Sequence, residues 1–166
     1  VYALGRNPCP RAVEILLNIL KKDSNAYVRK ATAWSLGNYA EDSVLSPLIK
    51  ALQNDVAAVR LWAAGSLAEV GSSSSDNAES ASNQLLESLR IDSEPVVRSN
   101  CIWSLGRLYD KLNSERKQEM LEDLVEVLLN DTESSVRYEA RVVLEQLDSP
   151  QVRTRFKALF DEGLLA

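Results

Sequence analysis

A short motif built on Val-Arg occurs four times along the chain, and this internal repeat decides which folds are open to it. Each copy has an Asp four or five residues before the Val, a small residue three positions after the Arg and a Leu seven positions after it. The Arg-to-Arg spacings are 31, 38 and 39 residues. The four motifs contain Asp23 and Arg29, Asp55 and Arg60, Asp92 and Arg98, and Asp131 and Arg137. Because one such unit is too short to bury a core alone, the repeat predicts an array of stacked units.

Amphipathic helices occupy the stretches between the motifs. Apolar residues recur there at helical spacing, as in Val44, Leu48 and Leu52. A unit then consists of a first helix, a short turn that contains the Asp, and a second helix that begins near the Val-Arg pair. The few Gly (6) and Pro (5) residues and an aromatic content of 6% also favour helices over a sheet. We predict an all-α fold, a right-handed α-α solenoid of helix pairs.

The predicted units form a single repeat array over residues 1–166. Val1–Gly5 matches the middle of the motif, with Leu4 in the place of Leu36, so we expect the sequence to begin inside a repeat as part of a longer chain. We expect units at about residues 1–7, 8–40, 41–71, 78–110 and 115–148, and a C-terminal cap helix at 150–166. The Ser-rich segment 71–77 is predicted to be an exposed, mobile loop between repeats.

Composition excludes several classes of site. The chain contains no histidine, which excludes Ser-His-Asp and Cys-His catalysis and His-ligated metals. Cys9 and Cys101 are far apart and form no CxxC pair, so neither a Cys-rich metal site nor a disulfide framework is expected. The net charge of −5 disfavours nucleic acid and anionic lipid as partners. The apolar stretches are short and no secretory leader is evident. We predict a cytoplasmic protein without a cofactor, and a binding role rather than catalysis.

The pattern Asp-x3/4-Val-Arg-x2-small-x3-Leu-Gly resembles the HEAT-like repeats of the phycobilisome (bilin) lyase type. The resemblance covers nearly the whole chain, and Leu36-Gly37 and Leu105-Gly106 match the end of the pattern. It implies a solenoid whose second helices line the concave side. It also implies more than one functional class, because these repeats occur in bilin lyase subunits, in phycobilisome-degradation factors and in scaffolds.

Other helical repeat families match the sequence less closely. Trp34–Tyr39 resembles the tetratricopeptide pattern, but its Trp-to-Leu gap is one residue short and the period is not a steady one of about 34 residues. Armadillo units would need a third helix, for which the shortest unit has little room. Deoxyhypusine hydroxylases resemble this architecture but bind iron through His-Glu pairs. HEAT-like DNA glycosylases need a basic groove, which the acidic composition disfavours.

The motif's charged residues are expected to serve the architecture. Each Asp can accept hydrogen bonds from N-terminal amides of the second helix, or pair with an Arg of a neighbouring unit. The arginines would then form a ladder along the stack. Cys101 occupies the small-residue position and is expected to be buried, whereas Cys9 lies in a turn between repeats.

The side of the second helices that points away from the core carries the candidate binding residues. Val28, Thr32 and Leu36 define the core direction at about 100° per residue, and Trp34 lies opposite to it. Trp103 and Tyr2 occupy the equivalent positions, and a Gly at residue 65 leaves a gap. We call this surface the second-helix face; its predicted residues are Tyr2, Arg6, Lys30, Trp34, Asn38, Leu61, Ser99, Trp103, Arg107 and Tyr138. The tryptophans either anchor a partner or brace the neighbouring helix.

The residues leave two functional hypotheses open. The first is a non-catalytic scaffold that binds another protein along the concave face, with no nucleic-acid or membrane partner. The second is a subunit of a bilin lyase, or a chromophore chaperone, that holds a linear tetrapyrrole in the same place. In that case the cysteine of the partner would be the nucleophile, and this chain would orient and shield the chromophore.

Overall fold

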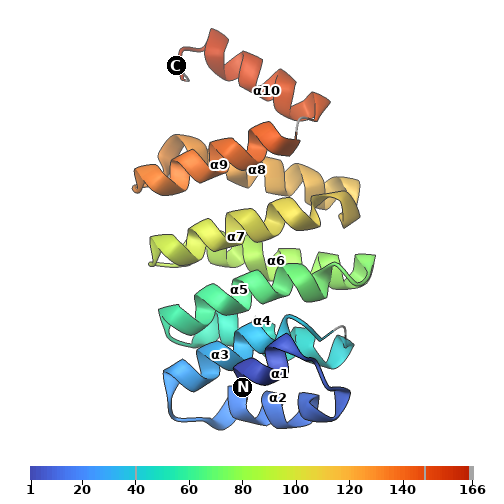
Figure 1. The fold of residues 1–166 in the computed structure, drawn as a ribbon. Helices are drawn as coiled ribbons and strands as arrows, with labels where there is room; N and C mark the ends of the chain where they lie inside the picture. Colours follow the sequence, from blue (N-terminus) through green and yellow to red (C-terminus); the bar gives the residue numbers. More distant parts are fainter. Residues whose placement is uncertain (40, 148, 165–166) are drawn as a thin grey trace.

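The computed structural model describes residues 1–39, 41–147 and 149–164, and over these residues the chain forms helices joined by short turns (Figure 1). The α-helices are α1 (Tyr2–Arg6), α2 (Val13–Lys22), α3 (Ala26–Leu36), α4 (Asp42–Asn54), α5 (Ala57–Gly71), α6 (Ser75–Ile91), α7 (Pro95–Leu108), α8 (Ser114–Asn130), α9 (Ser134–Leu147) and α10 (Pro150–Asp161). The 3-10 helices are η1 (Pro10–Ala12) and η2 (Tyr109–Lys111). The predicted unit ends at residues 40 and 148, and the predicted end of the cap helix at 166, lie outside the described residues.

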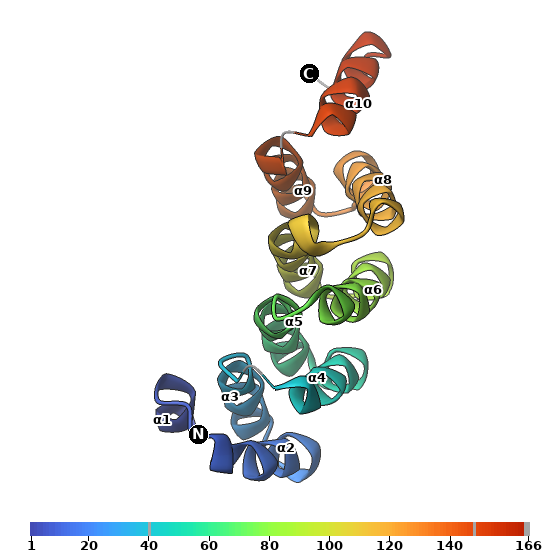
Figure 2. The same ribbon diagram turned by 90° about the vertical axis from the view of Figure 1, so that its right-hand side faces the viewer.

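The helices stack in two layers, which confirms the prediction of an all-α solenoid. The first helices α2, α4, α6 and α8 form one layer, and the second helices α3, α5, α7 and α9 form the other (Figure 2). Each first helix packs on the second helix of its own unit, and the second helices also pack on one another along the stack. The second-helix layer is the more closely packed of the two, and it lies on the inside of the bend of the stack (Figure 2).

The core lies between the two layers and is built from the motif positions. Val59, Val97 and Val136 are fully buried, as predicted for the Val of the motif. The small-residue and Leu positions are buried with them; these include Ala63, Cys101, Ala140, Leu36, Leu67 and Leu105. Each buried Val or Leu contributes about 1.5–3 kcal/mol to stability. Because neighbouring helix pairs cover much of this apolar area, each helix pair depends on its neighbours for its stability.

Serine and glycine let neighbouring second helices approach closely. Ser66 Oγ on α5 donates a hydrogen bond to the carbonyl oxygen of Ala33 on α3 at 2.8 Å, and Ser104 Oγ on α7 donates to Ala64 on α5 at 2.9 Å. A Cβ atom on Gly37 would lie 2.6 Å from Ser66 Oγ, so this position has no room for a side chain. The second helices are therefore locked in one register, with their far sides presented to the inside of the bend.

The Ser-rich segment is mostly helical, so its prediction as a loop was wrong, although residues 73–76 are exposed as predicted. α5 continues through Gly71, and Ser74 caps α6 by accepting a hydrogen bond from the Asn77 backbone N–H at 3.1 Å. Asn77 Nδ2 then donates to Asp42 Oδ1 of α4 at 2.8 Å. Residues 72–74 alone separate the two helices. Composition alone predicted a loop because Ser and Asn are common in flexible linkers, but the same residues are also strong N-cap residues.

Candidate functional site

A ladder of Arg–Asp pairs joins successive units and sets the spacing of the second helices. Arg98 Nε and Nη2 each lie 2.8 Å from a carboxylate oxygen of Asp131 in the next unit, and Nη1 donates to the backbone oxygen of Asp92 at 2.9 Å. The other pairs of the ladder are Arg29–Asp55 and Arg60–Asp92. Such two-point pairs fix both the distance and the orientation of the groups that they join.

The aspartates of the ladder also order the turns before the second helices. Asp131 Oδ1 accepts a hydrogen bond from the Glu133 backbone N–H at 2.9 Å. Burial opposes the ionisation of Asp131, but the hydrogen bonds from Arg98 and the Glu133 N–H outweigh it, so the pKa of this carboxyl lies below its usual value. The hydrogen bond between Arg98 and the Asp131 carboxylate also raises the pKa of Arg98. The predicted architectural role of the motif is thus confirmed.

Trp34 packs against the preceding helix. Ser35 Oγ donates to the Val1 carbonyl oxygen at 3.2 Å, which places α1 in the register of a second helix. A Cβ atom on Gly5 of α1 would collide with the Trp34 ring, so the ring lies directly over this glycine. The centroids of the Tyr2 and Trp34 rings are 5.6 Å apart, and the planes of the two rings meet at 53°. Trp34 is half-buried, so its contacts favour the second of the two roles predicted for it, the bracing of the neighbouring helix, because Gly5 leaves room for the ring.

Trp103 and Tyr138 are exposed on the second-helix face. Trp103 is 38% exposed and Tyr138 is 67% exposed. Arg107 lies one turn after Trp103 on α7 and forms an ion pair with Glu69 of α5, in which both side chains are about half exposed. An aromatic ring and a cation four residues apart therefore lie on one side of α7, toward the inside of the bend.

The polar residues predicted for the face differ in how far they reach solvent. Arg6 and Asn38 are exposed, whereas Lys30 and Ser99 are half-buried. Lys30 Nζ lies 6.0 Å from the ring centroid of Tyr27, one turn earlier on α3. The structure thus places Arg6 and Lys30 on α1 and α3, at one end of the face, and the Arg107–Glu69 ion pair between α5 and α7, near its middle.

The gap predicted at Gly65 is narrowed by α7. Asn100 Nδ2 donates to the carbonyl oxygen of Leu61, and a Cβ atom on Gly65 would lie 3.2 Å from Asn100 Nδ2. Leu61 is half-buried and packs partly against the core, beside α7, so its place on the binding face stays a prediction. Trp62 beside it is 37% exposed and was not predicted. It is about 60° from the centre of the face on a helical wheel, two residues after the motif Arg, where a wider search would have found it.

The second-helix face offers aromatic and charged side chains for contacts with a partner, and the two cysteines of the chain lie elsewhere. Cys101 is fully buried, and this burial raises the pKa of its thiol; Cys9 is exposed in a turn. Within residues 1–39, 41–147 and 149–164, no three His, Cys, Asp or Glu side chains are grouped to hold a metal ion. Nor do the described helices include one with the length and hydropathy needed to cross a membrane.

Comparison with known proteins supports the repeat architecture. A family model of HEAT repeats matches residues 13–106 and again residues 82–163. A search of curated proteins found no relative of this chain. Among solved structures, the chain is similar to a designed armadillo repeat protein in complex with the peptide (KR)4, with a TM-score of 0.66 and 21% identity. The similarity covers 93% of this chain and 72% of the designed protein. The family match is to HEAT repeats in general and does not single out the phycobilisome-lyase type.

Proposed function

Because the chain belongs to the HEAT-repeat family, we propose that it is a non-catalytic scaffold that binds a partner protein along the second-helix face. Stacked helix pairs present an extended concave surface, and such surfaces bind proteins and peptides by many small contacts. The designed armadillo protein of similar fold binds a peptide. The proposal places the partner along the second-helix face from α1 to α9, at the inside of the bend.

The exposure of Trp103 and Tyr138 is the observation that supports this proposal most strongly. Both are large aromatic side chains on the inner layer, and neither is needed to complete the core. Aromatic residues of this kind are the commonest anchors in protein interfaces, because they bury a large area and lose little conformational entropy. Trp34 belongs instead to the packing between α1 and α3.

The charges on the face indicate what kind of partner it can accept. Its exposed or half-buried cations are Arg6, Lys30 and Arg107, against the single carboxylate of Glu69. A strongly basic peptide such as (KR)4 is therefore a poor match for this surface, although the chain as a whole carries a charge of −5. A segment with apolar or aromatic side chains and a few carboxylates is the better match.

The proposal can be tested with peptides selected from a displayed random library on the immobilised chain. Synthetic, fluorescein-labelled versions of the selected peptides would then be titrated with the chain and followed by fluorescence anisotropy. We expect Trp103→Ala and Tyr138→Ala each to weaken binding by about tenfold to thirtyfold, the loss typical of a truncated interface anchor.

Ile15→Ala is the matched control for these variants. Ile15 is 60% exposed on α2, in the outer layer, so its truncation removes a similar exposed apolar group away from the proposed site. Binding to this variant should be unchanged. If the selected peptides bind all three variants with equal affinity, the partner does not lie on the second-helix face and the proposal is wrong.

A further inference from the structure

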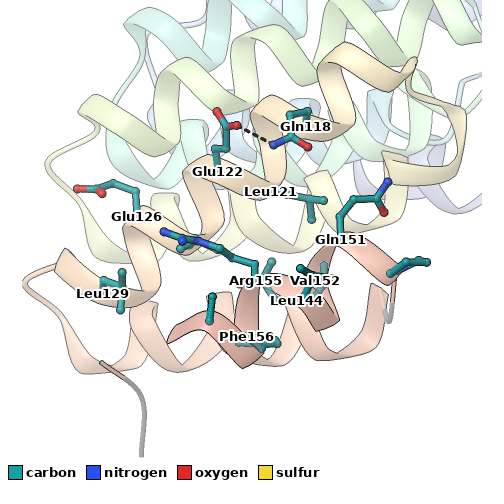
Figure 3. A pocket seen from close by; sticks show the side chains of 14 residues that line it. Gln118, Leu121, Glu122, Glu126, Leu129, Leu144, Gln151, Val152, Arg155 and Phe156 are labelled. Atoms are coloured by element: carbon teal, nitrogen blue, oxygen red, sulfur yellow. Dashed lines mark hydrogen bonds between the residues drawn. The ribbon is translucent and has the colours of Figure 1, made fainter. Parts of the chain in front are cut away.

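A partly apolar groove lies between α8 and α10, near the C-terminal end of the stack. A groove of about 850 Å³ separates these helices, with Leu144 of α9 at its floor. Leu121, Val125 and Leu129 line it from α8, and Val152 and Phe156 line it from α10 (Figure 3). Pairs of first helices earlier in the stack pack directly on each other, whereas α10 packs mainly on α9. The groove thus takes the place of a contact between first helices.

The α8 wall of the groove is long enough for about two turns of an α-helix. Its α8 wall has apolar side chains at three successive positions four residues apart, and its α10 wall has two more at the same spacing. At 1.5 Å per residue, the eight residues from Leu121 to Leu129 span about 12 Å, or a little over two helical turns. Two apolar ridges above an apolar floor are the geometry in which an amphipathic helix binds through side chains at i, i+4 and i+7.

The α8 edge of the groove is acidic. Glu122 and Glu126 line the groove and are exposed, and each accepts a hydrogen bond from a neutral amide of its own helix: Gln118 at 2.7 Å and Asn130 at 2.9 Å. In the described part of the chain, neither carboxylate forms an ion pair. Arg155 projects from α10 over the groove but does not reach either of them within ion-pair distance (Figure 3). Two like charges four residues apart on one helix repel each other, so this edge favours a cationic partner.

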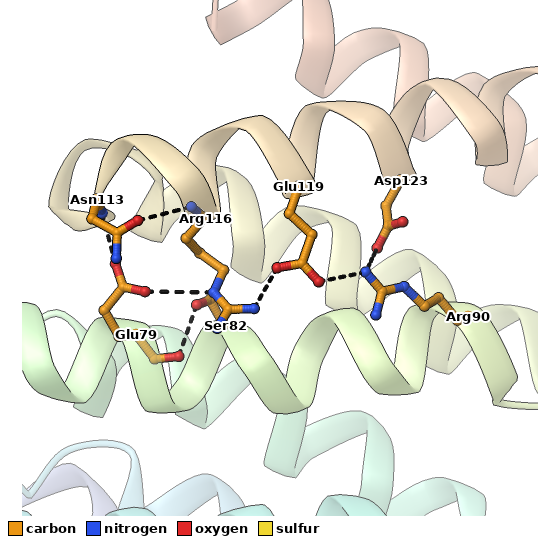
Figure 4. Close-up of polar contacts among 7 residues, drawn as sticks. All are labelled: Glu79, Ser82, Arg90, Asn113, Arg116, Glu119 and Asp123. Atoms are coloured by element: carbon orange, nitrogen blue, oxygen red, sulfur yellow. Dashed lines mark hydrogen bonds and ion pairs between the residues drawn. The ribbon is translucent and has the colours of Figure 1, made fainter.

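On the side of α8 that faces α6, carboxylates form ion pairs with arginines. There Glu119 and Asp123 form ion pairs with Arg90 of α6 at 2.6 and 2.7 Å, and Glu119 also pairs with Arg116 (Figure 4). Arg116 reaches Glu79 of α6 at 3.4 Å as well. The contact between α6 and α8 thus joins two amphipathic helices through Arg–carboxylate pairs. The groove presents the same kind of acidic edge, but in the described part of the chain no cation forms an ion pair with its two carboxylates, Arg155 included.

We propose that the groove between α8 and α10 binds an amphipathic α-helix of a partner protein. The apolar side of that helix would insert between the two walls, and its Lys or Arg side chains would face Glu122 and Glu126. This site is separate from the second-helix face, and it does not depend on the function proposed for that face.

A pair of model peptides of about 15 residues, long enough to form a marginally stable helix, tests the proposal. One carries Leu at i, i+4 and i+7 and Arg along one flank of that stripe; the other has Glu in place of each Arg. Both are fluorescein-labelled and titrated with the unmodified 166-residue chain, with binding measured by fluorescence anisotropy. We expect the Arg peptide to bind about tenfold more tightly than the Glu peptide.

Charge reversal then locates the contact. The double variant Glu122→Lys, Glu126→Lys should bind the Arg peptide at least about tenfold more weakly and bind the Glu peptide more tightly than the unmodified chain does. The gain for the Glu peptide cannot come from unfolding, which would only reduce binding. The control variant Glu14→Lys, Glu87→Lys makes the same change in net charge on α2 and α6, at exposed positions outside the groove, and should leave the preference for Arg unchanged.

Three results would overturn the proposal. The first is equal binding of the two peptides by the unmodified chain, or no binding by either. The second is a control variant that loses the Arg peptide as completely as the groove variant does. The third is a concentration-dependent dimer in sedimentation velocity that the groove variant abolishes, because the groove would then be filled by a second copy of the chain.

Discussion

The Arg–Asp ladder predicts a large loss of stability for Arg98→Ala. This change removes both hydrogen bonds to the Asp131 carboxylate and the one to the Asp92 backbone oxygen. The Arg98 and Asp131 side chains are only 11% and 7% exposed, so Asp131 would remain largely desolvated without its cation. Removing one partner of a buried pair costs about 3–5 kcal/mol, and we expect about 3 kcal/mol here because some exposure remains. For a chain of this length this loss lowers the melting temperature by about 6–12 °C.

Arg107→Ala is the matched control, measured by thermal and urea unfolding followed by circular dichroism. Arg107 lies on the same helix and also pairs across units, but its ion pair with Glu69 is about half exposed. Exposed pairs contribute about 0–1 kcal/mol, so this variant should melt within a few degrees of the unmodified chain. Equal shifts for the two variants would refute the reasoning, because burial of the ladder would then add nothing to its strength.

Acid should weaken the ladder, because the pKa of Asp131 is lower in the folded chain than in the unfolded one. The contribution of Asp131 to the free energy of unfolding is therefore complete above about pH 4 and is lost as the pH falls through the folded-state pKa. Unfolding free energies measured from pH 6 to pH 2 should show the gap between the unmodified chain and the Arg98 variant closing at the acidic end. Gly37→Ala should lower stability by about 1–3 kcal/mol, because the new Cβ would displace Ser66 and push α3 away from α5. In urea unfolding, Gly37→Ala should lower the free energy of unfolding more than Gly65→Ala does, since the atom nearest to a Cβ at Gly65 is a side-chain nitrogen 3.2 Å away. Ser74→Ala should cost about 1 kcal/mol through loss of the N-cap of α6, whereas Ser80→Ala, exposed inside the same helix, should be neutral or slightly stabilising in the same assay.

The periodic part of this protein could be predicted from the order of its residues. The Val, small-residue and Leu positions of the motif lie on one side of a helix whatever surrounds it, because the helical repeat alone decides which side chains share a face. Burial of Val97, Cys101 and Leu105 follows from that geometry. The partners of Arg98 and Arg60 could be predicted too, since identical units stacked in one register must bring each Arg to the same Asp of the next unit.

The exposed surfaces were decided by contacts between helices that are distant in sequence. Trp34 and Trp103 are equivalent on the helical wheel, yet Trp34 lies over Gly5, whereas the equivalent position on the helix before Trp103 holds Ala68. Leu61 is half-buried, and Asn100 of α7 donates a hydrogen bond to its carbonyl oxygen, a contact that its position on the wheel did not indicate. The groove beside α8 likewise depends on where α10 packs, and α10 packs mainly on α9. A periodic pattern specifies the direction of each side chain within its own helix, but the exposure of that side chain depends on the size of the residues that the neighbouring helix places against it.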